Sequence, residues 1–528
     1  MFGQTGTSSF RGGYSISYLH DGFTTISNAL GTGTTNPGLI QTAAQTTPTG
    51  VLTSSGVALP VASFVMPITD RQNFLANPNN ALWAIDPNLA IPYVQQWSFG
   101  YEREITRDMA FEVRYVANHA VKVWRANNFN EMNIFENGFL KEFLNAQRNL
   151  AARGGASFAP NGVAGTAACA ACVALPIFNT FFTQAGLPTG QTTAGQFANA
   201  TNISNLNLNN VGALANNLAF STTFRLNREN AALGIPANFF VANPNAAGIT
   251  MLTNDSMSNY NALQIEIRRR FSGGLQFNAD YTFSKALTDA RDALGNNQND
   301  LTSFRTLRDK GLDDARSNQD QTHRFVFNSI YDLPIGRGRR YLSDTNGVVD
   351  RILGGWTVGS IVVWQTRPPV YVASNRTTVN NFNAANNPAD LVGMSFEEFK
   401  KNVGLFRTPT GVYFINPAIL NIVTNSAGQF VSSQIKPGIL AAPAPGVFGN
   451  FPINSLNGPH YFDIDMSLVK RIPITERVKG ELKTTFLNIL NNPNFVYVTQ
   501  NFDSTSFGRI TSQSGNPRII NFQFKVTW

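Results

Sequence analysis

Residues 261–285 read NALQIEIRRRFSGGLQFNADYTFSK and carry a clear structural signal. Leu263, Ile265 and Ile267 alternate with polar neighbours, and the same period of two resumes after a Ser-Gly-Gly triplet. Strict alternation of apolar and polar side chains is typical of a β-strand with one apolar and one polar face. Paired glycines accept the positive φ angles of a tight turn. The stretch therefore predicts an antiparallel β-hairpin.

Segments with the same period recur along the whole chain, and they predict about ten strands. These strands are expected near 10–20, 94–104, 109–118, 259–271, 275–285, 323–333, 356–366, 460–471, 476–489 and 516–528. All but the first and last combine into successive hairpins. In the last hairpin, Asp463 and Asp465 are expected to face Lys479, Glu481 and Lys483 across the strands. Such cross-strand charge pairs contribute only about 0.2–1 kcal/mol each, so they fix register more than they stabilise.

The composition limits the classes of protein to which the chain can belong. Only 14% of the residues are charged, whereas 41 of the 528 are Phe. Strands that present aromatics to lipid and Asn, Gln, Ser and Thr to a watery lumen have this profile, and so does an extracellular β-sandwich. The net charge of +8 comes from short clusters such as 268–270 and not from a basic stripe, which argues against nucleic-acid binding.

Short and long connections alternate along the chain. Connections inside the hairpins are mostly short, but those between hairpins, at 22–93, 119–258, 286–322, 367–459 and 490–515, are long. Outer-membrane barrels are built in this way, with short periplasmic turns and long extracellular loops. We therefore predict an all-β protein, an antiparallel transmembrane β-barrel with long extracellular loops, in the bacterial outer membrane.

Several features of the loops have simple interpretations. Stretches 137–153 and 395–406 are predicted to be amphipathic helices packed on the outer loops, the first with Phe139, Leu140, Phe143, Leu144 and Leu150 on one side and Glu142 elsewhere. Cys169 and Cys172 are expected to form a disulfide within a loop, with two unpaired small residues as the alternative. The acidic residues Asp309, Asp313, Asp314 and Asp320 lack the spacing of an EF-hand, so we expect a solvated loop there, with calcium binding by these carboxylates and Asn318 as the alternative.

Catalytic and cofactor motifs do not emerge from the sequence. The histidines are His20, His119, His323 and His460, which are scattered, and neither G-x-S-x-G nor H-E-x-x-H occurs. The start has no basic and apolar signal-peptide pattern, and no apolar run of eighteen residues occurs. We expect no enzymatic activity, no cofactor and no metal centre.

Five ordered motifs carry a family resemblance. YVQQWSFGYEREI with MAFEVRYVANHA (93–120), SNYNALQIEIRRRFSGG and its continuation (258–287), DQTHRFVFNSIYDLPIGRGRRY (320–341), GGWTVGSIVVWQTRPPVYV (354–372) and the final 48 residues from ELKTTFLNIL onward resemble the C-terminal barrel region of TonB-dependent outer-membrane transporters. More narrowly, the chain resembles the Oar-like subgroup, which begins with a carboxypeptidase-regulatory-like domain.

The resemblance implies a barrel of about 22 strands, of which this chain supplies only the C-terminal part, without plug or N-terminal domain. It implies uptake of a scarce small ligand, energised by TonB through the missing plug, so that the chain alone is not expected to transport actively. Wall residues expected to face the lumen are Gln264, Glu266, Asp280, Asp463, Asp465, Lys479 and Lys483. The resemblance also assigns the aromatic end of the chain, with Phe522, Phe524, Val526 and Trp528 on the lipid face, as a signal to the barrel-assembly machinery.

Two rival functions remain open at this stage. A passive porin or a surface adhesin would have the same kind of barrel, and it would lack plug and TonB-box sequence upstream. A soluble, secreted, glycan-binding β-sandwich would share only the alternation, and it would stay in water without detergent.

Overall fold

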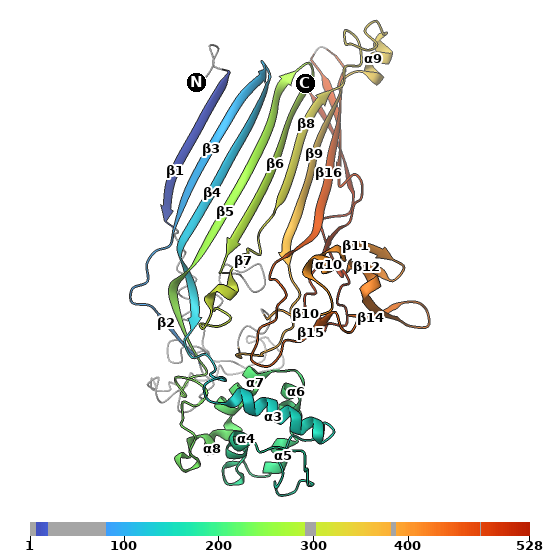
Figure 1. Ribbon diagram of the computed structural model, residues 1–528. Coiled ribbons are helices and arrows are strands. Elements are labelled where there is room, and N and C mark those ends of the chain that lie inside the picture. The colour runs from blue at the N-terminus through green and yellow to red at the C-terminus, as the bar shows by residue number, and fades with distance from the viewer. Residues whose placement is uncertain (1–6, 19–80, 291–302, 382–386, 476) are drawn as a thin grey trace, which may run out of the picture.

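One antiparallel sheet forms the wall of the molecule (Figure 1). The computed structural model describes residues 7–18, 81–290, 303–381, 387–475 and 477–528. The sheet follows the order β1-β3-β4-β5-β6-β8-β9-β16-β17-β20, and two short strands, β2 and β7, pair with β5 and β6. The strands of the path are β1 (Ser8–Tyr18), β3 (Tyr93–Thr106), β4 (Met109–Asn128), β5 (Gly248–Ser272), β6 (Leu275–Thr288), β8 (His323–Asp332), β9 (Trp356–Val370), β16 (Leu456–Pro473), β17 (Lys479–Leu487) and β20 (Ile519–Thr527). The attached strands are β2 (Ala81–Ile85) and β7 (Ala315–Arg316).

Every strand of this path overlaps one of the segments expected from the sequence, although β4 and β5 are much longer than expected. The ladder between them shifts register between Ala120 and Val123 and again between Val123 and Arg125, and Lys122 has a positive φ of 58°. These bulges break the period of two, so the alternation beyond residue 118 is not visible in the sequence. Residues 19 and 20 of the first expected strand, including His20, and residue 476 lie outside the described residues.

The short and long connections lie at opposite ends of the sheet. The connections 107–108, 273–274 and 333–355, and the one between β16 and β17, join the strands at the end near both chain termini, where α9 (Gly347–Leu353) also lies (Figure 1). The connections 129–247, 289–322, 371–455 and 488–518 follow the opposite strand ends. The alternation predicted from the sequence is therefore present in the fold.

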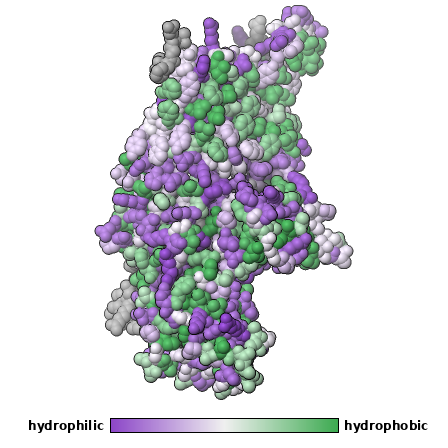
Figure 2. Space-filling view, viewed as in Figure 1, coloured by the Kyte–Doolittle hydropathy of each residue, from purple (hydrophilic) through white to green (hydrophobic). Residues whose placement is uncertain are grey.

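The sheet has an apolar face that lies open to the surroundings. Side chains on this face include Phe99, Tyr115, Leu263 and Phe283, which are all between 39% and 59% exposed. Figure 2 shows hydrophobic residues gathered over the strand region of the visible face, with a hydrophilic belt below them. Among the described residues, the outer edges of β1 and β20 have no pairing strand, so the sheet is an open arc.

The connection between β4 and β5 folds into a helical subdomain, residues 129–247. Its helices are α3 (Phe139–Ala152), α4 (Pro176–Phe181), α5 (Thr193–Phe197), α6 (Ala200–Asn207), α7 (Val211–Phe220) and α8 (Arg225–Glu229), with short 3₁₀ turns η1 (Gln184–Gly186), η2 (Thr222–Phe224) and η3 (Ala231–Leu233). Its core is rich in phenylalanine, for example Phe139, Phe158 and Phe178, which are completely buried. The many phenylalanines of the chain therefore lie in this core as well as on the lipid-facing side of the sheet.

Helix α3 matches the helix predicted over 137–153, but its buried face differs from the expected one. Leu144 is 40% exposed, whereas Glu142 is buried because its two carboxylate oxygens accept the backbone N–H groups of Ile177 and Phe178 at 3.0 and 2.7 Å. The N–H groups at the start of α4 thereby stabilise a buried carboxylate that the sequence pattern had placed on the surface.

The connections after β9 and β17 form a second, mostly β, loop unit. It contains α10 (Phe396–Lys401), η6 (Pro417–Ile419) and four two-stranded ladders, which are β10 (Asp390–Leu391) with β15 (Leu440–Ala441), β11 (Val403–Thr408) with β12 (Gly411–Ile415), β13 (Leu420–Thr424) with β14 (Phe430–Ile435), and β18 (Asn494–Val496) with β19 (Ser512–Ser514). The helix predicted over 395–406 was too long. It ends at Lys401, since the chain from Val403 pairs with β12 as a strand.

Candidate functional site

The wall residues singled out from the sequence share one face of the sheet. The register places Glu266 of β5 opposite Asp280 of β6, with Gln264 two residues away on the same face. Asp463 and Asp465 of β16, and Lys479 and Lys483 of β17, have the same parity through the ladders β9–β16 and β16–β17. All of these side chains therefore project from the polar side of the wall.

This polar face is the concave face of the arc. A hollow of about 670 Å³ is lined by residues of β5, β6, β8, β9, β16 and β17, including Glu266, Asp465 and Lys483. A smaller hollow of about 260 Å³ holds Gln264 and Asp280 beside Arg324. Residues from strands that are not neighbours can line one space only where the sheet curves around it.

A row of carboxylates crosses the concave face. Glu102 of β3, Glu112 of β4 and Glu266 of β5 lie opposite one another in the register. Arg268 bridges them, with N–O distances of 3.8 Å to Glu112 and 3.7 Å to Glu266 and a close contact to Glu102, and Arg11 of β1 lies 2.6 Å from Glu102. Only the register reveals this row, because its members are up to 164 positions apart in the sequence.

The charge pairs expected in the last hairpin were wrong. Lys483 lies opposite Val469 and Lys479 opposite Pro473, while the cross-strand ion pair of this hairpin joins Arg471 and Glu481 at 3.5 Å. The register of this ladder carries the lysines past the two aspartates. Asp465 accepts the backbone N–H of Asn488 at 2.8 Å instead.

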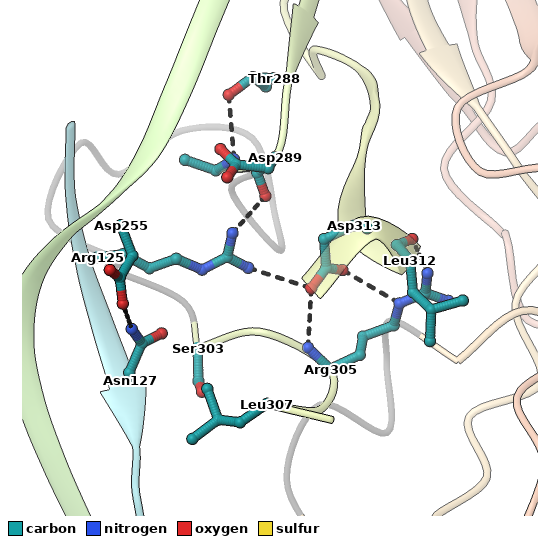
Figure 3. A network of polar contacts seen from close by, with 12 residues as sticks. Arg125, Asn127, Asp255, Thr288, Asp289, Ser303, Arg305, Leu307, Leu312 and Asp313 are labelled. Atoms are coloured by element: carbon teal, nitrogen blue, oxygen red, sulfur yellow. Dashed lines mark hydrogen bonds and ion pairs between the residues drawn. The ribbon is translucent and has the colours of Figure 1, made fainter. Parts of the chain in front are cut away.

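A buried ion network joins the end of the wall to the loop between β6 and β8 (Figure 3). Arg125 of β4 donates to the carbonyl of Asp289 at 2.6 Å and to Asp313 at 3.3 Å. Asp313 also accepts the backbone N–H and Nε–H of Arg305, at 2.9 and 3.1 Å. The Arg125 guanidinium lies over the ring of Phe304, with 3.4 Å between Cζ and the ring centroid. Asp313 is therefore held by two arginines out of contact with water.

The expectation of a solvated acidic loop was wrong for two of its four members. Asp313 and Asp320 are 2% and 1% exposed, and Asp320 forms an ion pair with Arg316 at 2.7 Å. Asp309 instead caps the turn η4 (Lys310–Asp313) by accepting the N–H of Gly311. Within the described ranges, no group of three or more His, Cys, Asp or Glu side chains is placed to hold a metal ion.

The long loops that follow β4, β6 and β9 are tied together at the end of the wall farthest from the chain termini. Glu131, at the start of the helical subdomain, accepts the N–H of Leu307 at 2.9 Å and the side-chain amide of Asn380 at 3.1 Å. The backbone N–H of Gly212 in α7 donates to the carbonyl of Thr377 at 2.7 Å. The loops thereby form one joined cap, and this cap was not foreseen because its contacts link segments far apart in the sequence.

Two further predicted features can be located. Cys169 and Cys172 are joined in a disulfide in the helical subdomain. Phe522, Phe524 and Val526 lie on the apolar face of β20, opposite Thr484, Leu482 and Gly480 of β17, and Trp528 is 93% exposed. The last strand therefore presents an unbroken row of apolar side chains.

An open antiparallel wall with an apolar convex face, a charged concave face and all long loops at one end defines an outer-membrane β-barrel. A sequence model of the outer membrane beta barrel domain matches residues 2–521, so the chain belongs to this family and lies in the bacterial outer membrane. The soluble β-sandwich alternative is therefore wrong. No helix among the described residues is both long and apolar enough to cross a bilayer.

Solved structures of outer-membrane proteins resemble the fold weakly. The outer membrane transporter YddB from Escherichia coli has 8% identity and a TM-score of 0.32, and the match covers 85% of this chain and 34% of that chain. The ferripyoverdine receptor of Pseudomonas aeruginosa has 11% identity and a TM-score of 0.30, with coverages of 85% and 29%. The ferric preacinetobactin receptor BauA from Acinetobacter baumannii has 6% identity and a TM-score of 0.29, with coverages of 83% and 30%. The chain thus spans about a third of the length of these structures. No curated protein matches it in sequence.

Proposed function

We propose that this chain is the barrel portion of a TonB-dependent transporter, which takes up a scarce ligand through the outer membrane. The observation that carries the proposal is the charged concave face of an arc whose two edges lack partners among the described residues. Unpaired backbone groups cost several kcal/mol each in lipid, so we expect further strands to pair with the two edges and close the wall. A wall that is completed to a larger barrel leaves room for a plug. The residues that would face this plug are Gln264, Glu266, Asp280, Asp463, Asp465, Lys479 and Lys483.

The sequence motifs support the same proposal, since they resemble TonB-dependent transporters over most of residues 94–528. Membership of the Oar-like subgroup stays a prediction. We expect the protein to contact outer-membrane lipid through its convex face, and to contact TonB only through a plug outside this chain. The matched family is defined by a membrane barrel and not by a catalytic activity, and we propose no enzymatic role.

A passive porin or an adhesin is the second candidate, because either would have the same wall. The discriminating measurement is conductance of the protein in planar bilayers, purified from outer membranes in the form that the organism makes. A plugged transporter gives no steady channel conductance and binds the purified periplasmic domain of TonB. A steady conductance without TonB binding would establish a pore, and a silent barrel without TonB binding would favour the adhesin.

We also propose that β20 is read by the barrel-assembly machinery during insertion. Its apolar face ends in Trp528, and all its residues are exposed. An aromatic residue at this position suits the membrane interface, where aromatic girdles gather.

A further inference from the structure

The helical subdomain contains a hollow that the barrel does not use. It has a volume of about 410 Å³ and lies where the segment 190–192, α5, α6, the end of α7 and η2 meet. These helices lie at the end of the molecule farthest from the two chain termini (Figure 1), which is the extracellular end of the barrel. The volume falls within the range of about 300–1,000 Å³ that is typical of small-molecule sites.

The chemistry of this hollow is unusual because its lining is polar without being charged. Apart from glycines and the ring of Phe224, every residue that lines it is Asn, Gln, Ser or Thr. Small-molecule pockets are more often apolar with a few polar groups. An anionic or cationic ligand would find no counter-charge among these residues, and an apolar ligand would strip water from amides and hydroxyls without replacing their hydrogen bonds.

Several of these polar groups are held in place by the fold but keep hydrogen-bonding capacity to spare. Asn199 uses its carbonyl oxygen to accept the N–H groups of Thr201 and Asn202, at 3.0 and 3.2 Å, and its NH₂ group has no partner within the described part of the chain. Asn217 donates to Asn202 at 3.2 Å, and its other amide atom has no partner among the described residues. Whichever way each amide is oriented, one donor or acceptor remains for a ligand.

Two hydroxyl groups complete the set. Thr201 lies at the start of α6, and Thr223 lies in η2, the 3₁₀ turn that follows α7. Neither side-chain oxygen has a hydrogen-bond partner among the described residues, and a hydroxyl both donates and accepts. The hollow therefore offers donors and acceptors on several sides, fixed by helix caps and amide pairs.

We propose that this hollow binds an uncharged, hydroxyl-rich ligand, namely a neutral oligosaccharide. Each hydroxyl of a sugar donates and accepts a hydrogen bond, which matches amides and hydroxyls arranged around a space without net charge. The inference does not rest on energised uptake, because the hollow lies in a loop subdomain and not in the wall or the plug.

The test uses the detergent-purified protein and calorimetric titration with maltohexaose, cellohexaose, mannohexaose and xylohexaose, and with hexagalacturonate as a charged comparison. We expect at least one neutral sugar to bind, and Thr201→Val and Thr223→Val each to weaken its binding about fivefold, because each removes one net hydrogen bond of about 1 kcal/mol. Both substitutions keep the shape of the side chain, and no hydrogen bond of either hydroxyl to a described residue is lost.

The matched control is Thr222→Val, since Thr222 is the exposed neighbour of Thr223 and does not line the hollow. It should leave the affinity unchanged. The proposal is overturned if no neutral sugar binds at about 10 mM, if only the charged sugar binds, or if the hollow variants bind as tightly as the control. Because binding is measured without transport, this result is independent of the conductance and TonB experiments.

Discussion

Arg125 and Asp313 form an ion pair of 3.3 Å in which the two side chains are only 3% and 2% exposed. Arg125 belongs to strand β4 of the wall, and Asp313 lies 188 positions later, in the loop between β6 and β8 (Figure 3). Because the two charges are buried, water neither solvates nor screens them, and the pair holds the loop against the barrel wall. Two consequences for the loop can be measured.

Replacing Asp313 with Asn should release the loop from the wall. The change leaves Arg125 and Arg305 buried without their carboxylate, and breaking a buried pair from one side typically costs about 3–5 kcal/mol. Hydrogen exchange of the amides from 303 to 316 measures the free energy of local opening. Glu229→Gln is the control, because its pair with Arg225 is exposed and is worth about 0–1 kcal/mol. Equal protection in the two variants would contradict the assigned role of the network.

The stability of the same loop should depend on pH through Asp314. Asp314 is exposed, but partial desolvation, followed by the nearby carboxylates of Asp289 and Asp313, raises its pKa above the ordinary value of 3.8. The closed loop then holds the proton more tightly than the opened loop, so stability falls as pH rises from 3.8 through the raised pKa. Asp314→Asn should remove this loss and protect the loop better than wild type at neutral pH. If the difference in opening free energy between the two proteins stayed constant from pH 3 to pH 7, the argument would fail.

Gly212 should be necessary for the contact between the helical subdomain and the loop after β9. A Cβ added there would overlap the backbone of Asn380, which cannot move aside like a flexible side chain. We expect Gly212→Ala to cost about 1–3 kcal/mol in the local opening of residues 371–380, measured by hydrogen exchange. Gly347→Ala is the matched control, because nothing lies within 4 Å of a Cβ at that helical position. Unchanged protection in Gly212→Ala would show that the two loops are not in close contact.

The two faces of the wall should differ in their contact with lipid. A fluorophore attached to Leu263→Cys should be quenched by brominated lipid, since Leu263 is on the apolar face and 39% exposed. The adjacent Gln264→Cys should be quenched several-fold less, because successive side chains of a strand point to opposite faces. Similar quenching at both positions would rule out Gln264 as a lumen-facing residue.

Trp528→Ala should lower the amount of protein assembled in the outer membrane several-fold if the last strand is an assembly signal. Gln523→Ala, on the opposite face of β20, should have little effect. Heat-modifiable mobility of the membrane fraction on gels reports folded barrel in both cases. Normal assembly of Trp528→Ala, or equal loss in both variants, would argue against the signal.

Much of the wall was readable from the sequence because its information is local. Alternation of residues such as Leu263, Gln264 and Ile265 fixes both the strand and its two faces, and the covalent geometry of an extended chain imposes that period wherever the strand goes. The helix over 137–153 was readable for the same reason. The bulges near Lys122 hid the extension of β4, since a single added residue reverses the faces.

The candidate site was less readable because its contacts are distant in the sequence. The sequence pattern placed Glu142 on the surface, but the structure buries it against two N–H groups at the start of α4. Asp320 was expected to be solvated, but it forms an ion pair with Arg316. The polar hollow of the helical subdomain depends on the packing of α5, α6 and α7, each of which is short and shows little periodicity of its own.

The sequence by itself determined that the chain forms a two-faced antiparallel wall with long loops at one end, because strand periodicity and turn chemistry act over a few neighbouring residues. Only the tertiary structure decided which charges meet. The pair of Arg125 with Asp313 depends on the closure of loops over more than a hundred residues. The row of Glu102, Glu112 and Glu266 depends on the register of the strands. Burial, and hence the chemistry of each polar group, is a property of that assembled neighbourhood.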